Sequence, residues 1–262
     1  MTDIFTLSDH FSKYFNIYLA DTPELKKEVF RIRYKVYCEE LGYEPLDKFP
    51  DKLEKDIYDN RSIHCILQHK PTGIYAGCVR LILSNQDSPN DQFPFEYICP
   101  NHSLDFNTMP REHFGEVSRL AVLSRFRKRL GEENTPEGLI VFDQKKEDKQ
   151  LEDKAKQKRR SPVIALSLYL AATVVVVDLE LEYALTLMEP RLARHLRMMG
   201  LNFSPIGKAI DFHGKRGPFS IKIPGLVNNL RKNSEVYGLF QTIYNSVGNK
   251  SSHNQEYDER IS

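Results

Sequence analysis

The apolar run from Val163 to Val177 constrains the fold more than any other feature of this chain. It contains Ser167 and Thr173 and ends at Asp178, so it is shorter than the roughly 18–20 apolar residues that a membrane-spanning helix needs. Ser161-Pro162 in front of it supplies an N-cap and the proline of a first helical turn. The run therefore predicts a buried helix and leaves open whether its end runs into a strand.

Length and charge indicate one domain and argue against nucleic acid as a partner. The 262 residues, 40% of them hydrophobic, can bury one sizeable core but are short for two full domains. The net charge is only +1 and the pI is about 7.7, whereas a dedicated nucleic-acid binder is strongly basic. We expect a single domain over residues 1–245 and a disordered polar tail over residues 246–262.

The cysteines and the N-terminus indicate a cytoplasmic protein without a metal site. Cys38, Cys65, Cys78 and Cys99 form no C-x-x-C pair, so neither zinc ligation nor a disulfide framework is expected. We interpret them as reduced, mostly buried thiols; a nucleophilic cysteine stays open, although no histidine motif supports one. The first 14 residues lack the basic-then-apolar pattern of a signal peptide.

Hydrophobic periodicity and turn residues predict alternating strands and helices. Strands are expected at residues 15–20, 62–67, 75–83, 116–123 and 183–188, and two final ones at 201–205 and 219–223 with a turn at 214–217. Helices are expected at residues 23–41, 163–177 and 190–199. Pro71-Thr72-Gly73 joins the second and third strands as a hairpin. This order predicts an α/β (α+β) fold with a mixed central sheet and helices on both faces.

Two segments interrupt the pattern. Residues 84–111 form a long loop with room for a short helix, and loops of that length are usually functional or mobile. Residues 131–160 are dominated by lysines and acids, which indicates a charged insertion that is either a solvated helix or disordered.

Charged side chains inside apolar strands are the strongest chemical signal. Arg80 lies within Gly77–Leu83, where a charge is costly unless it is paired or faces a cleft. Glu116 and Arg119 lie in a strand otherwise built for the core, and residues three apart point to opposite faces of a regular strand. Either a bulge re-aims one of them or the two have different partners. A buried, ion-paired carboxylate has the altered proton affinity that an acid–base site requires.

Two further groups are ambiguous when taken alone. Arg33 and Tyr37 share a helical face, and Tyr43 follows. Together they can hold a carboxylate beside an apolar or cationic group, or the arginine can simply be solvated. Asp56 and Asp59 can bind a substrate amine or neutralise a basic cluster, or they can be surface acids.

Taken in their order along the chain, these groups resemble the motifs of acyl-homoserine-lactone (LuxI-type) autoinducer synthases. The arginine–aromatic–aromatic series, aspartate pair, strand arginine and Glu-x-Ser-Arg motif of that family match Arg33, Tyr37, Tyr43, Asp56, Asp59, Arg80, Glu116, Ser118 and Arg119. Phe93 or Phe95 lies where the family has another aromatic residue. The resemblance covers residues 15–123 and continues more weakly to residues 207–214. It implies a GNAT-like acyltransferase fold.

Two departures point to relatives of those synthases. Tyr43 stands where the quorum-signal enzymes usually have tryptophan, and this chain has no tryptophan. The segments 84–111 and 131–160 are also longer. Both features look more like N-acyl amino acid synthases and PEP-CTERM/exosortase-associated acyltransferases. The resemblance implies transfer of a long-chain acyl group from an acyl-carrier-protein or acyl-CoA thioester to the amine of an amino acid, without a permanently bound cofactor.

For such a reaction, Glu116 is the expected base, with Ser118 and Arg119 beside it, and backbone amides around residues 120–123 polarise the thioester carbonyl. Arg33 and the two aspartates would hold the acceptor or order an N-terminal lid, and Arg80 and Arg119 would pair with the carboxylates. Tyr37, Tyr43, Phe93 and Phe95 complete the expected substrate site. The helix from Val163 and the strand after it would line the acyl chain.

The basic run Arg125, Arg127, Lys128 and Arg129 is followed by a single glycine, Gly131. CoA-using GNAT enzymes have a glycine-rich phosphate-binding turn at this position, so the run better fits docking of an acidic acyl-carrier protein. Two rival functions stay open: homoserine-lactone synthesis from S-adenosylmethionine, and a non-catalytic module that binds acyl groups. Peripheral membrane contact through the charged insertion also stays open.

Overall fold

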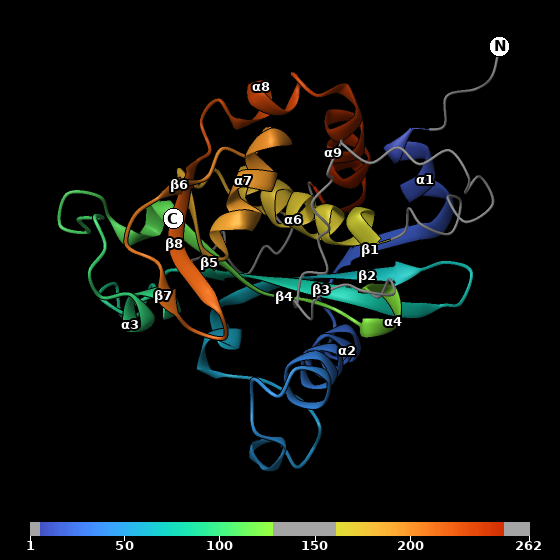
Figure 1. The fold of residues 1–262 in the computed structure, drawn as a ribbon, viewed down its shortest axis with the longest axis horizontal. Coiled ribbons are helices and arrows are strands. Elements are labelled where there is room, and N and C mark those ends of the chain that lie inside the picture. Colours follow the sequence, from blue (N-terminus) through green and yellow to red (C-terminus); the bar gives the residue numbers. More distant parts are fainter. Residues whose placement is uncertain (1–5, 128–160, 249–262) are drawn as a thin grey trace.

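A mixed β-sheet forms the middle layer of the molecule (Figure 1). The computed structural model describes residues 6–127 and 161–248, and these contain eight strands in the order β1-β2-β3-β4-β5-β8-β6, with β7 paired to β8. All neighbours are antiparallel except β4 and β5, which are parallel. The strands are β1 (Phe15–Leu19), β2 (Ser62–His69), β3 (Ile74–Leu83), β4 (Phe114–Val122), β5 (Tyr183–Met188), β6 (Ser204–Pro205), β7 (Ile210–Asp211) and β8 (Lys215–Lys222).

Helices cover both faces of the sheet. On one face α6 packs across β2, β3 and β4, with α9 and α1 beside it, whereas α2 covers the opposite face (Figure 1). The helices are α1 (Leu7–Tyr14), α2 (Pro23–Tyr34), α3 (Pro94–Ile98), α4 (Ser124–Arg127), α6 (Ser161–Asp178), α7 (Pro190–Met198), α8 (Leu226–Leu230) and α9 (Ser234–Val247). A π-helical turn, η1 (Lys35–Glu40), extends α2, and short 3-10 turns lie at η2 (Leu46–Lys48), η3 (Ile57–Arg61) and η4 (Arg111–His113). The expected fold class is confirmed.

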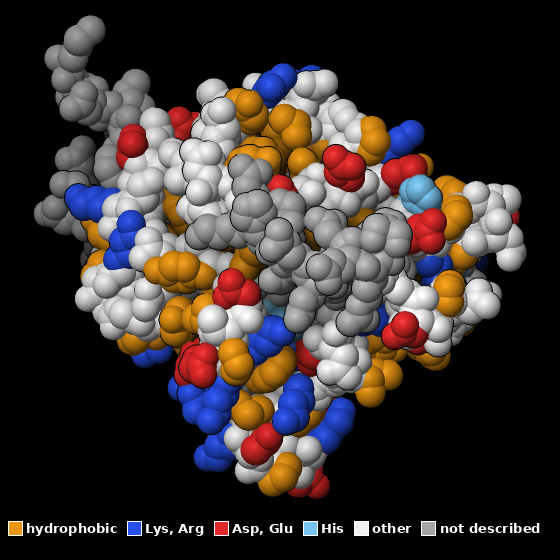
Figure 2. Space-filling view, turned by 180° about the vertical axis from the view of Figure 1, so that it is seen from behind, with side chains coloured by type: hydrophobic (Ala, Val, Ile, Leu, Met, Phe, Trp, Pro, Cys, Tyr) orange, Lys and Arg blue, Asp and Glu red, His pale blue; other side chains and the backbone are white. Residues whose placement is uncertain are grey.

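The surface formed by α2 and the loop after it carries both signs of charge. Lysines and arginines lie among acidic side chains at this end of the molecule, which is at the bottom of both views (Figure 2). Lys26, Lys27 and Arg31 lie on α2 together with the exposed Glu24. This interspersion agrees with the near-zero net charge of the chain.

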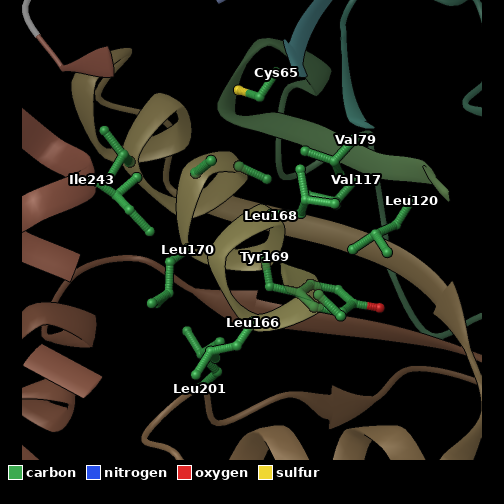
Figure 3. Close-up of a cluster of buried hydrophobic side chains, with 14 of the residues drawn as sticks. Cys65, Val79, Val117, Leu120, Leu166, Leu168, Tyr169, Leu170, Leu201 and Ile243 are labelled. Carbon is green, nitrogen blue, oxygen red and sulfur yellow. The ribbon is translucent and has the colours of Figure 1, made fainter. Parts of the chain in front are cut away.

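The apolar run at 163–177 is the central helix of the core, as its composition predicts. Its side chains are buried all round the helix, so α6 has no polar face to turn toward water. Leu168 lies against Val79 and Val117 of the sheet, and Ile243 of α9 lies on the other side of α6 (Figure 3). The helix ends at Asp178 and a turn separates it from β5, so it does not run into a strand. None of the described helices is long and apolar enough to cross a membrane.

Close packing of α6 on the sheet depends on Gly77. A Cβ atom at this position would lie 2.7 Å from the carbonyl oxygen of Ala121 and 3.0 Å from Cδ1 of Leu168. Both neighbours are themselves packed, so neither can move away without disturbing α6 or β4.

We therefore expect Gly77→Ala to lower the free energy of unfolding by about 1–3 kcal/mol, the usual effect of overpacking a core. Gly238→Ala is the matched control, because its Cβ would meet only the Cβ of Ser8 at 3.9 Å, and alanine favours a helix. Urea denaturation of both variants measures the difference. Equal stability of the two variants would show that α6 can shift away from β3 at little cost.

The end of the chain departs from the expected pattern. The segment after residue 223 forms α8 and α9, which the sequence-based prediction omitted, and α9 ends at Val247, past the expected domain end at residue 245. The helical signal was present: Asn233 caps α9, and its buried residues recur with helical spacing. The predicted turn at 214–217 is wrong beyond Gly214, because residues 215–217 belong to β8. The insertion at 131–160 and residues 249–262 of the tail lie outside the described residues.

Candidate active site

Strand β4 carries a β-bulge at the second of its two charged residues, Arg119. The register between β3 and β4 shifts here, leaving Val79 opposite both Arg119 and Leu120. Arg119 has a φ of 50°, a left-handed conformation that is uncommon for a residue with a side chain. As a result, Arg119 and Glu116 line the same cavity although they are three residues apart in one strand. The bulge re-aims Arg119, and the two residues also have different partners: Glu116 accepts from the N–H of Phe95, whereas Arg119 donates to Glu54.

Strands β4 and β5 separate next to this bulge. Their pairing is limited to Phe114–Glu116 with Tyr183–Leu185, although both strands continue. The separated ends enclose a cavity of about 230 Å³ that also has walls from α6, from the segment before β2 and from the hairpin of β7 and β8. Its lining residues are Tyr37, Tyr43, Glu44, Asp56, Tyr58, Arg80, Pro94, Ile98, Glu116, Val117, Ser118, Arg119, Leu120, Tyr169, Thr186, Leu187, Phe212, His213 and Arg216.

The carboxylate of Glu116 is the buried acid of this cavity, with an exposed fraction of 2%. Burial raises its pKa to about 7, and the charge of Glu96 acts in the same direction. The backbone N–H of Phe95, which donates to Oε2 at 3.0 Å, and the charges of Arg80 and Arg119 oppose this rise. A carboxyl group that titrates near neutral pH is suited to take a proton from an amine.

A buried network of charges lies behind the cavity. Arg33, which is fully buried, binds Glu54 through Nε and Asp59 through Nη1 at 2.6 Å. Nη1 of Arg80 binds Asp56 at 2.6 Å and Asp59 at 2.8 Å. Burial alone would raise the pKa of Asp59, but Arg33 and Arg80 hold it well below its ordinary value. The two aspartates therefore neutralise a basic cluster, one of the alternatives that the sequence left open.

Arg119 is held in place from several sides. Its Nε donates to Glu54 at 3.2 Å, and its Nη2 lies 3.4 Å from Glu44 and 3.6 Å from Asp56. The guanidinium also lies over the ring of Tyr37, 5.4 Å from its centroid. Three acids and one ring thus hold the arginine in its left-handed conformation, and its expected pairing with acids is present.

Three rings form one wall of the cavity. Tyr43 stacks on Tyr37 with centroids 6.5 Å apart and on His213 with centroids 4.3 Å apart. The hydroxyl of Tyr37 donates to the carbonyl oxygen of Leu120 at 3.0 Å, which ties this wall to the bulge. Burial lowers the pKa of His213 and the charge of Arg216 acts in the same direction, so the imidazole is neutral at pH 7.

Most of the residues that the sequence predicts for the site do line this cavity. Seven of the expected catalytic and substrate-binding residues line the cavity: Tyr37, Tyr43, Asp56, Arg80, Glu116, Ser118 and Arg119. Four do not: Arg33, Asp59, Phe93 and Phe95 lie behind its walls. The guanidinium of Arg33 is enclosed with Glu54 and Asp59, which disfavours direct contact with an acceptor; its alternative role, ordering an N-terminal lid, stays a prediction. Phe93 and Phe95 pack in a hydrophobic cluster beside the cavity instead.

The basic run after β4 is divided between two environments. Arg125 is exposed, but Arg127 is buried and paired with Glu40, so it is not available as a docking residue. Glu40 also accepts hydrogen bonds from the backbone N–H of Ser124. Arg127 therefore fixes α4 against η1. Lys128 and Arg129 lie outside the described residues.

Several residues of the site escaped sequence reasoning. Glu54 is 1% exposed and joins Arg33 to Arg119, yet in the sequence it is one acid among many in a loop. Phe212, His213 and Arg216 reach the cavity from the last hairpin. The only signal for them was the weak similarity around residues 207–214. Among the described residues, no group of histidine, cysteine, aspartate or glutamate side chains could hold a metal ion.

The raised pKa of Glu116 predicts a pH-dependent stability difference between wild type and Glu116→Gln. The folded pKa is about 7 against an ordinary value of 4.5, so wild type loses stability as pH rises between these values. We expect the glutamine variant to match wild type below pH 4.5 and to be more stable by up to about 3 kcal/mol above pH 7. Chemical denaturation of both proteins from pH 4 to 9 measures this difference. A difference that does not change with pH would mean that Glu116 keeps an ordinary pKa.

Comparisons with known proteins agree with this geometry. Residues 32–135 match the model of the acetyltransferase (GNAT) domain. The chain has a GNAT-like fold, a mixed sheet flanked by helices whose strands β4 and β5 separate beside the bulge. No curated protein matches the sequence.

Three solved structures illustrate this similarity in fold. TofI, solved in a ternary complex with an inhibitor and MTA, is 18% identical with a TM-score of 0.55, over 82% of this chain and 96% of TofI. BjaI, a CoA-dependent acyl-homoserine lactone synthase solved with SAM and isopentyl-CoA, is 16% identical with a TM-score of 0.53, over 89% and 92%. FeeM, an N-acyl amino acid synthase from uncultured soil microbes, is 14% identical with a TM-score of 0.52, over 82% and 94%.

Proposed function

We propose that this protein is an N-acyltransferase that moves an acyl group from a thioester to the amine of an amino acid or a similar small acceptor. The observation that carries the proposal is Glu116, a buried carboxylate with a pKa of about 7 on the wall of the cavity between the separated strands. The similarity in fold to FeeM, an N-acyl amino acid synthase, supports this acceptor class.

In the proposed reaction, Glu116 takes a proton from the acceptor amine as its nitrogen attacks the thioester carbonyl carbon. A new C–N bond forms, the carbonyl oxygen becomes negative, and the C–S bond then breaks. The departing sulfur takes up the proton from Glu116, directly or through water. No covalent enzyme intermediate is needed, because the amine attacks the thioester itself.

Backbone groups at the bulge are the proposed donors to the negative oxygen. The N–H of Leu123 is bonded to the carbonyl of Ala76, so this end of the expected 120–123 segment is occupied. The hydroxyl of Tyr37 donates to the carbonyl of Leu120 and so holds the backbone at the bulge in place. We therefore assign this role to the N–H groups of Arg119 and Leu120, where the ladder is interrupted.

The proposed acyl chain lies along Tyr169 of α6 and Thr186 and Leu187 of β5, which form the less polar wall of the cavity. The proposed donor is an acyl-carrier protein or CoA thioester, and the exposed Arg125 is the described residue of the basic run that would meet an acidic carrier. The long acyl chain, the cytoplasmic location and the resemblance to PEP-CTERM/exosortase-associated acyltransferases stay predictions from the sequence.

The test supplies purified protein with acyl-carrier-protein and acyl-CoA thioesters of several chain lengths, together with the common amino acids. Mass spectrometry is expected to find an N-acyl amino acid with at least one donor, formed only when the protein is present. Absence of transfer from either thioester class would favour the module that binds acyl groups without turnover.

Homoserine-lactone synthesis is the second candidate, because the chain shares its fold with TofI and BjaI, two proteins solved with MTA or SAM. The same assay with S-adenosylmethionine as acceptor separates the two functions. An acyl-homoserine lactone would overturn the amino acid as acceptor but keep Glu116 as the base.

A further inference from the structure

The short helix α3 is held directly against Glu116. The N–H of Phe95 donates to Oε2 of Glu116 at 3.0 Å. One residue further along, the side chain of Glu96 turns back and accepts the N–H of Phe93 at 2.7 Å. This capping contact fixes the first turn of α3 and, with it, the direction in which the Phe95 N–H points.

Glu96 is itself held by Arg111. Its carboxylate is 4% exposed and receives two N–H groups from Arg111, from Nη1 to Oε1 and from Nη2 to Oε2 at 2.8 Å. The guanidinium lies over the ring of Phe106, 3.9 Å from its centroid. Arg111 is in η4, directly before β4, so the pair ties α3, in the middle of the long loop, to the start of the strand that carries Glu116.

The other charges around Glu116 show why this pair matters for its protonation. Arg80 from β3 and Arg119 from β4 favour the carboxylate, whereas Glu96 from α3 disfavours it. Tyr58 from η3 and Cys99 after α3 also face Glu116, and burial raises the pKa of both, so they are neutral at pH 7. His102 also lies close to the pair, with its Nε2 3.8 Å from Glu96. Glu96 is thus a like charge close to the base, and Arg111 is bound directly to it.

We propose that Glu96 and Arg111 are a positioning pair for Glu116. They aim the Phe95 N–H at the carboxylate of Glu116, and Arg111 screens this carboxylate from the charge of Glu96. The inference rests on the proposed function, in which Glu116 is the base. Arg111 does not line the cavity, so its effect on the reaction passes through the protonation of Glu116.

Charge-removing variants test the proposal through the pH–rate profile of acyl transfer. Arg111→Gln leaves Glu96 unscreened and is expected to move the midpoint of the profile upward by about half a pH unit or more. Glu96→Gln leaves the positive charge of Arg111 and is expected to move it downward. The double variant removes both charges and is expected to return the midpoint to near the wild-type value. Glu112→Gln, an exposed neighbour in the same turn, is the control and is expected to cause no shift.

A second measurement does not depend on activity or on the acceptor. Each of these proteins is paired with a second version that also carries Glu116→Gln, and the unfolding temperatures of the two are compared across pH 4 to 9. The pH at which the two curves stop diverging reports the ionisation of Glu116. It is expected to be higher for Arg111→Gln and lower for Glu96→Gln than for the otherwise wild-type protein.

The outcomes separate the two proposals. If no acyl transfer occurs but the unfolding curves move as expected, the positioning pair stands and the proposed function falls. If all variants lose activity or stability with unchanged midpoints in both measurements, the pair is only structural and the inference is overturned.

Discussion

Replacing Glu116 with glutamine is expected to lower kcat for acyl transfer by about 100- to 10,000-fold, the usual contribution of a general base. Glutamine keeps the shape of the side chain and can still accept the Phe95 N–H, but it cannot take the amine proton. Because the lost step follows binding, KM for the acceptor should change much less than kcat. Steady-state kinetics with a saturating thioester measure both.

The pH profile of the wild-type enzyme provides the independent check. Only the ionised carboxylate can act as the base, so the rate is expected to rise with pH and to level off above the pKa of about 7. Glu180→Gln, an exposed acid outside the cavity lining, serves as the control and should retain the full rate. A Glu116→Gln variant with an unchanged rate would remove Glu116 from the mechanism.

Replacing Arg33 with methionine is expected to lower the free energy of unfolding by about 3–5 kcal/mol, the range found when one partner of a buried ion pair is removed. The change leaves the carboxylate of Glu54, 1% exposed, without its main partner and removes one of two cations from Asp59. Urea denaturation at pH 7 measures the loss. Lowering the pH should reduce this loss of stability, because the carboxylates that have lost Arg33 as a partner can then be protonated.

Arg31→Met is the matched control on the same helix. Arg31 is exposed and pairs with Glu28 one turn earlier, so its loss should change stability by less than about 1 kcal/mol. If the two variants are equally stable, water reaches the network behind the cavity and its charges are screened. In that case the burial of Arg33 would not explain how Glu54 and Asp59 are kept ionised.

The sequence predicted the cavity best where a charge violated an apolar pattern. Arg80 and Glu116 interrupt strands whose other residues are typical of a core, so they had to be paired or to face a cleft, and the structure shows both situations. Glu54 and Glu96 have equally important contacts, but Glu54 is one acid among many in its loop, and Glu96 lies among aromatic residues of a long loop without a strand or helix period. Their burial depends on how the loops fold onto β3 and β4, which no local periodicity reports.

The same limit explains the misplaced residues. Arg33 was expected to meet a substrate because it shares a helical face with Tyr37, and the structure does bury both side chains. The helical period predicts the direction in which a side chain points, but not how deeply it is buried or which groups it contacts. Tyr37 is one turn further along and reaches the cavity, whereas Arg33 meets the acids of the following loop first. Depth of this kind follows from tertiary packing alone.

The short pairing of β4 with β5 gives the sheet a line of weakness. Only three residue pairs join the β1–β4 half to the half that contains β5 and β8 in the described part of the chain, whereas β2 and β3 are paired along almost their whole length. The two halves can therefore tilt slightly about this seam without breaking a continuous ladder, and α6 packs on the β2–β4 side of it. A wider or narrower opening of the cavity can then arise from rigid-body tilting, while the registers inside each half stay unchanged.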